Sequence, residues 1–256
     1  MPTQAEIAQH REAIAALAAL ARSDLAAGLR GVDPQDAARV AAVLRDLLPV
    51  LVATYTPAVS TVAADFYDVL RLDAEVEAAF AAAVLAPPAA ADLQESIGGW
   101  LTPLFAAGAA SAAATLTSET VATTLDTIVD TLVAATDQQT VEANVAADPA
   151  APHYARHASV GACAFCAMLA QRGPDYVSEE SATRVVIGRG KRRLGEKYHP
   201  NCHCTAVPVW DKATYEEAPY VAQWRQAYKD ATRAVRGAEK PTKAVLAHMR
   251  ESLGTN

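Results

Sequence analysis

The stretch Asp148-Pro149-Ala150-Ala151-Pro152 divides the sequence into two parts that differ in composition and charge. Its two prolines interrupt an alanine-rich pattern, because proline lacks the backbone donor that a helix interior needs. Residues 1–150 carry 6 basic and 19 acidic side chains, a net charge of −13, whereas residues 151–256 carry 16 and 10, a net charge of +6. The first lysine is Lys191. We therefore predict a boundary between two modules at this stretch.

The part before the boundary is predicted to be helical throughout. The chain is 52% hydrophobic with few large apolar residues, and its many alanines favour closely packed helices. Thr3 and Glu6 match a capping box, and Asp33-Pro34 matches a second helix start. The first helix is expected to end at Gly31. Its apolar stripe comprises Ile14, Leu17, Leu20, Leu25 and Leu29.

The second helix is expected to run toward Pro49 and to kink there. Further helices are predicted over residues 57–72, 74–86, 89–106 and 116–140. The uncharged run Ser96 to Ser118 is long enough to cross a bilayer, but its glycines and proline indicate a buried or surface-lying helix pair. This composition leads us to expect no membrane span. Met1 to Glu12 lacks the apolar core of a secretory signal, so we expect the chain to be made and kept in the cytoplasm.

The part after the boundary shows shorter segments with glycines between them. They are a helix over Ala162–Gln171, a β-hairpin over Thr183–Tyr198, a strand over Thr205–Trp210 and a helix over Lys212–Arg236. The predicted fold class is mainly α: a helical arm or bundle over residues 1–148, then a small α+β module over residues 153–236. A basic tail is expected over residues 237–256.

All four cysteines lie in the second part, as Cys163-Ala-Phe-Cys166 and Cys202-His203-Cys204. The two-residue gap of the first pair lets both sulfurs bind one tetrahedral ion, and His199 precedes Cys202 by the same gap. Six candidate ligands compete for four positions. The preferred set for a structural zinc ion is Cys163, Cys166, His199 and Cys202, with Cys204 as the substitute for His199.

Two other interpretations of the cysteines stay open. The cysteines could remain ordinary buried thiols, or they could pair as disulfides after the protein leaves the cytoplasm. A catalytic metal is disfavoured, because such a site needs an open position and a general base, and Glu196 is the only nearby carboxylate.

The segment from Val160 to Trp210 resembles the MuF-like minor head proteins of tailed bacteriophages. The resemblance rests on Cys163-Ala-Phe-Cys166 and on His199-Pro-Asn-Cys-His-Cys204, which runs into a predicted strand. His203 stands where that family usually has arginine, so the role of that arginine is not carried over.

This resemblance implies a low-copy structural protein of the procapsid that binds near the portal and takes part in head morphogenesis. It also implies contacts with the portal, with major capsid or scaffolding protein and with packaged DNA, and an oligomer set by portal symmetry. The chain is then expected in the host cytoplasm during assembly and later in the virion. The hairpin tip, with Arg189, Lys191, Arg192 and Arg193, would face DNA or the portal, or would be a solvated turn.

One alternative is a zinc-stabilised nucleic-acid-binding protein. It is supported by the positive charge of the second part and by basic residues that recur on one side of a predicted helix. These are Arg225, Lys229, Arg233, Arg236, Lys240 and Lys243. No stacking aromatics lie among the basic residues of the hairpin, which disfavours this alternative.

A second alternative is an enzyme, either a capsid-maturation protease or a toxin-like domain. The sequence contains no Gly-x-Ser-x-Gly, no His-Glu-x-x-His and no deaminase motif. His153 and His157 near Ser159 are expected to be surface or capping histidines. We therefore predict that the chain is not an enzyme.

Overall fold

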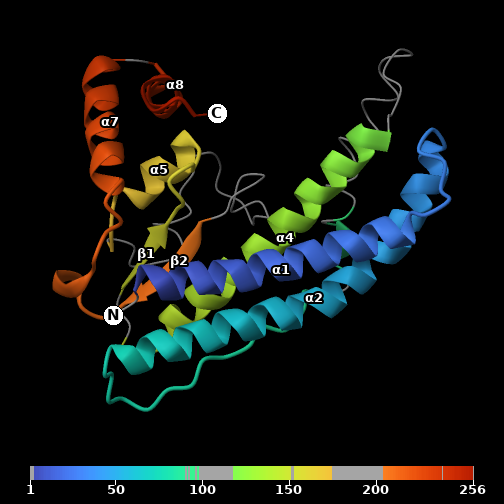
Figure 1. Ribbon diagram of the computed structural model, residues 1–256, viewed down its shortest axis with the longest axis horizontal. Helices are drawn as coiled ribbons and strands as arrows, with labels where there is room; N and C mark the ends of the chain where they lie inside the picture. The colour runs from blue at the N-terminus through green and yellow to red at the C-terminus, as the bar shows by residue number, and fades with distance from the viewer. Residues whose placement is uncertain are drawn as a thin grey trace.

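The computed structural model describes residues 3–89, 91, 93–95, 97, 118–150, 153–174, 204–237 and 239–255. These residues are mainly helical with one two-stranded sheet (Figure 1), which confirms the predicted mainly α class. The helices are α1 (Gln4–Gly28), α2 (Ala37–Asp73), α4 (Ser118–Ala147), α5 (Ala164–Ala170), η1 (Lys212–Thr214), α7 (Val221–Ala234) and α8 (Pro241–Leu253). The strands are β1 (His153–His157) and β2 (Thr205–Val209). The predicted hairpin over residues 183–198 lies outside the described residues.

The predicted capping box starts α1. The backbone N–H of Thr3 donates to Glu6 Oε2 at 2.6 Å, and the N–H of Glu6 donates to Thr3 Oγ1 at 3.2 Å. The helix ends at Gly28 rather than Gly31, and Gly31 lies in the following turn with a φ of +77°. That left-handed conformation explains why glycine stands there.

Helix α2 is one continuous element, so the predicted break before residue 57 is wrong. It begins at Ala37 with Asp36 as its cap, not Asp33, and it continues through Pro49 and Pro57. The buried side chains around both prolines hold this helix against α1 and α4. They include Leu48, Leu51, Val52, Tyr55 and Val59.

The long helices α1, α2 and α4 pack side by side and enclose the main apolar core (Figure 1). Leu25 of the predicted α1 stripe is fully buried, whereas Leu20 is 56% exposed. Among the described residues, α2 alone is long and apolar enough to cross a membrane, and half of its most apolar window is buried inside the protein. This burial is what a core helix requires.

Residues 74–89, predicted to be partly helical, form an irregular strap along α2 and α4 instead. Side chains of the helices bind the backbone of the strap. Asn144 accepts from the N–H of Ala83 at 2.7 Å and donates to its carbonyl at 3.0 Å, while Ser60 Oγ accepts from Leu85 at 2.6 Å. These bonds satisfy backbone groups that a helix would otherwise pair, so tertiary contacts override the helix propensity of alanine.

The strands β1 and β2 pair antiparallel, with His157 opposite Thr205 and His153 opposite Val209. The sequence predicted β2 but not β1, and all five residues of β2 are buried, where alternation was expected. The sheet packs against α4 and, through β2, against α2. The predicted module boundary therefore lies between elements that are in contact, and the division into modules stays a prediction.

The predicted helix α5 is confirmed. Helix α7 begins at Val221, later than the expected Lys212. The segment predicted as a basic tail contains α8, whose Val245 and Met249 are buried against α5 and α7. Pro241 in the first turn and Gly254 with φ +62° after the last turn delimit this helix.

Candidate functional site

Three of the four cysteines line one cavity of about 500 Å³. Cys163 occupies the N-cap position of α5 without a side-chain capping hydrogen bond, and Cys166 lies in the first turn of this helix, while Cys204 directly precedes β2. Cys166 and Cys204 are buried, and Cys163 is half-buried. Leu253, Gly254 and Thr255 at the end of α8 form another wall of this cavity, which we call the cysteine cavity.

The pairing of β1 with β2 explains why Cys204 lies at the same cavity as Cys163 and Cys166, about forty residues earlier in the sequence. The register that sets Thr205 opposite His157 places Cys204 beside the turn between β1 and α5. In that turn the N–H of Ala162 donates to the Ser159 carbonyl at 2.9 Å. Tyr220 also donates its hydroxyl to the Ala158 carbonyl at 2.8 Å, so α7 helps to fix the turn.

The other predicted zinc ligands, His199 and Cys202, and their competitor His203 lie outside the described residues. Within the described part of the chain, no three histidine, cysteine or acidic side chains are spaced to hold a metal ion. Cys163, Cys166 and Cys204 line one cavity, but among the described residues they do not by themselves form a group that could hold an ion. The zinc ion and its ligand set therefore stay a prediction.

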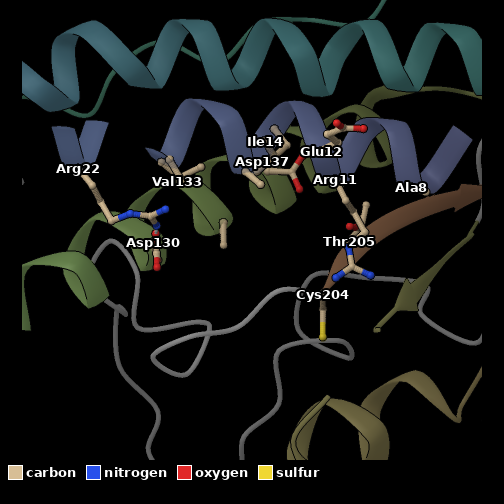
Figure 2. A pocket seen from close by; sticks show the side chains of 13 residues that line it. Ala8, Arg11, Glu12, Ile14, Arg22, Asp130, Val133, Asp137, Cys204 and Thr205 are labelled. Atoms are coloured by element: carbon tan, nitrogen blue, oxygen red, sulfur yellow. Dashed lines mark hydrogen bonds and ion pairs between the residues drawn. The ribbon is translucent and has the colours of Figure 1, made fainter. Parts of the chain in front are cut away.

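A second cavity of about 450 Å³ lies between α1, α4 and the start of β2, and Cys204 lines this one as well. Figure 2 shows Arg22 and Asp130, which form an ion pair, pointing toward each other at one end. Arg11 lies near Thr205 and Cys204 at the other end. The walls between these ends are mostly apolar and include Ile14 and Val133.

Buried polar contacts connect the helices with the sheet. Asp148 accepts from Arg71 Nε at 2.9 Å, from the Tyr67 hydroxyl at 3.0 Å and from Trp210 Nε1 at 3.4 Å. Burial raises the pKa of the Asp148 carboxyl, but the hydrogen bonds from Arg71, the Ala150 backbone, Tyr67 and Trp210 outweigh burial and hold it below its usual value.

Helix α4 carries more of these buried polar groups. Asp137 Oδ1 lies 2.7 Å from Nε2 of His10, whose ring stacks on Phe66 with centroids 4.0 Å apart. Gln138 donates to the Cys204 carbonyl and accepts from Arg156 at 3.3 Å. The sequence reasoning missed this network, although the uninterrupted polar run Thr136-Asp-Gln-Gln-Thr140 within an apolar helix was its signal.

His157 is only 8% exposed, so the expectation of a surface histidine is wrong for this residue. Its Nε2 lies 3.0 Å from Gln4 Oε1, which joins β1 to the start of α1. Burial, with the nearby charge of Arg11, lowers the pKa of His157 to about 4. A neutral, buried histidine bound to a glutamine side chain serves the packing of β1 against α1.

The predicted basic residues divide into two groups. Arg189, Lys191, Arg192 and Arg193 lie outside the described residues. Lys229, Arg233, Arg236, Lys240 and Lys243 are exposed on α7, the turn after it and the start of α8, whereas Arg225 is half-buried and pairs with Glu217.

Comparisons with known proteins give two matches. The model of the VG15 protein family matches residues 1–231. The Gene 15 protein of Mycobacterium phage D29 is 32% identical over a segment that covers 28% of this chain and 34% of that protein. The match therefore spans about a third of the relative's length. No solved structure matches.

Proposed function

Because this chain belongs to the VG15 protein family, we propose that it is a structural protein of a bacteriophage head, more narrowly a low-copy minor capsid protein bound near the portal. The matches support membership of a phage protein family, which agrees with the predicted phage origin, and the MuF-like assignment stays part of the proposal. The observation that carries it is the family match over residues 1–231, together with a relative from a bacteriophage.

The geometry of the chain supports a role in assembly. Its three long helices offer extended faces for partner proteins, and its buried ionic groups are engaged with one another. Cys163, Cys166 and Cys204 share one cavity, as expected if the two cysteine motifs belong to one module. In this proposal the protein is not an enzyme, and its partners are the portal, the major capsid or scaffolding protein, and packaged DNA.

A structural zinc ion at the cysteine cavity is part of this proposal. Zinc bound by thiolates would supply folding free energy to the segments that meet there, namely α5, the start of β2 and the end of α8. The proposed ligands are Cys163, Cys166, His199 and Cys202, with Cys204 as the substitute for His199. The ion would stabilise the fold and take no part in a reaction.

A phage that carries a tagged copy of the gene tests the proposal. We expect the protein in purified particles, at a few copies for each portal and far fewer than the major capsid protein, and we expect defective heads when the gene carries a stop codon. The full-length chain should also capture the portal protein in a pull-down. Normal heads without the protein, or cleavage of the major capsid protein that His157→Ala abolishes, would contradict it.

A further inference from the structure

The C-terminal end of α2 exposes a surface that is both acidic and apolar. Val69 and Leu72 are 48% and 77% exposed, and Asp65 lies on the same side of the helix, four and seven residues before them. We call this surface the acidic end, and it consists of Asp65, Asp68, Val69, Leu72, Asp73, Glu75 and Glu77. The one cation between residues 65 and 77, Arg71, is buried and bound to Asp148.

The carboxylates of the acidic end are crowded. A hydrogen bond with Glu6 of α1, slight burial and the charge of Glu6 raise the pKa of Asp73, although this side chain is exposed. The exposed Asp68 accepts a hydrogen bond from the Ala82 backbone at 2.9 Å. Because neighbouring negative charges repel one another, the acidic end would attract a cation supplied by another molecule.

A surface of opposite charge lies where α7 meets α8. We call it the basic corner, and its exposed charges are Lys229, Asp230, Arg233, Arg236, Glu239, Lys240 and Lys243. Five cations against two carboxylates give a net charge of +3. Arg233 pairs with Asp230 at 3.3 Å, and the side chains of Arg236, Lys240 and Lys243 form no ion pair within the described residues. Exposed Ala234 and Pro241 add small apolar surface between the charges.

The two surfaces lie at different corners of the molecule. Figure 1 shows the junction of α7 and α8 at the upper left and the C-terminal end of α2 at the lower left, with the sheet between them. One copy therefore cannot bring its own acidic end onto its own basic corner. Complementary patches at separate places produce a heterologous contact, in which each copy uses a different surface toward each of its two neighbours.

We propose that the acidic end of one copy binds the basic corner of a second copy, head to tail. A protein partner is favoured over DNA because the chain has a net charge of −7 and its first 150 residues carry −13, which repel a phosphate backbone. Leu72 and Val69 also need apolar cover, which the methyl and ring carbons of Ala234 and Pro241 provide.

Sedimentation velocity of the full-length chain at low ionic strength tests this contact. We expect species larger than one chain as concentration rises, and affinity that falls about tenfold or more at high salt, because exposed charges are screened. A corner variant carries Arg236→Gln, Lys240→Gln and Lys243→Gln. An end variant carries Asp65→Asn, Glu75→Gln and Glu77→Gln. A control for the end variant carries Glu12→Gln, Asp46→Asn and Asp126→Asn, which likewise remove three negative charges, but from exposed positions elsewhere.

Each of the two variants alone should sediment as a single chain, and the control should associate like the parent. An equimolar mixture of the two should give a complex of two chains and nothing larger, because only one productive contact remains. A parent chain that stays single at all concentrations would overturn the proposal, as would a mixture that fails to pair. It would also be overturned if the corner variant lost binding to duplex DNA while its self-association matched that of the parent.

Discussion

At the scale of single residues, Asp148 joins three segments that are distant in sequence: α2 through Tyr67 and Arg71, α4 through its own position, and the end of β2 through Trp210. Its side chain is fully buried, and that of Arg71 is 9% exposed. Asp148→Asn would leave a buried guanidinium without its counter-ion. We expect the free energy of unfolding, measured by denaturant titration, to fall by about 3–5 kcal/mol.

The matched control is Asp46→Asn on the exposed side of α2, which should change the free energy of unfolding by less than about 0.5 kcal/mol. Equal effects of the two substitutions would show that Asp148 does not hold the segments together.

His157 gives a prediction about pH. Its pKa is lowered to about 4 from 6.5, so the unfolded chain takes up a proton at a higher pH than the folded protein does. Its neutral form is therefore favourable at pH above 6.5, and stability should fall as the pH drops from 6.5 to 4, by up to about 3 kcal/mol.

His157→Gln keeps a polar partner for Gln4 and removes the titration, so the slope of unfolding free energy over this interval should flatten. Asp148 does not interfere, because its lowered pKa confines its loss of stability to pH values below about 3.8. An unchanged slope in the variant would show that another group is responsible.

At the scale of elements, the strap depends on side chains of its neighbours. The amide of Asn144 binds both the N–H and the carbonyl of Ala83, as a paired strand would. Asn144→Ala removes both bonds, and we expect a loss of about 1–3 kcal/mol and faster amide exchange at residues 82–85. Hydrogen exchange with mass spectrometry measures this. Thr123→Ala, at an exposed position on the same helix, should leave exchange in the strap unchanged.

The same strap shows where sequence reasoning about elements fails. Capping at Thr3 and Glu6 is local, and the predicted start of α1 is confirmed because the signal and the bonds lie in the same turn. The conformation of the strap, residues 74–89, depends instead on side chains such as Ser60 and Asn144, which are far away in sequence. The helix break predicted at Pro57 is wrong for a similar reason. Burial of α2 against α1 and α4 stabilises the helix by more than the missing backbone donor of proline costs.

The candidate site was predictable only where its signals are local in sequence. The spacing of Cys163 and Cys166 is a local signal, and the strand after Cys204 could be recognised from its apolar residues. What the sequence did not reveal is β1, which carries Arg156 and two histidines and has no apolar alternation. It becomes a strand by pairing with β2 and by burying Arg156 against α4, where this side chain lies 3.6 Å from Glu142.

At the scale of the whole molecule, the elements after residue 150 belong to two different apolar clusters. One cluster contains the sheet and the other contains α5, α7 and α8. Apolar packing of Val141 and Val145 with Ala206 and Val207 connects α4 with the sheet. Helices α5, α7 and α8 form a separate apolar cluster around the cysteine cavity, together with Cys166 and Cys204. Loss of a metal at that cavity should therefore loosen the second cluster first and leave the core of α1, α2 and α4 in place.

This separation gives a prediction about metal removal. If a zinc ion is bound, a chelator should increase amide exchange in α5, α7 and α8 by about tenfold or more, because the ligands supply folding free energy to these segments. Exchange in the buried turns of α1 and α2 should change far less. Cys166→Ser should reproduce the effect without chelator, whereas Met168→Leu, a volume-conserving change at a buried position of the same helix, should not. Equal exchange with and without chelator, in protein that elemental analysis finds free of zinc, would identify the cysteines as packing residues of this cluster.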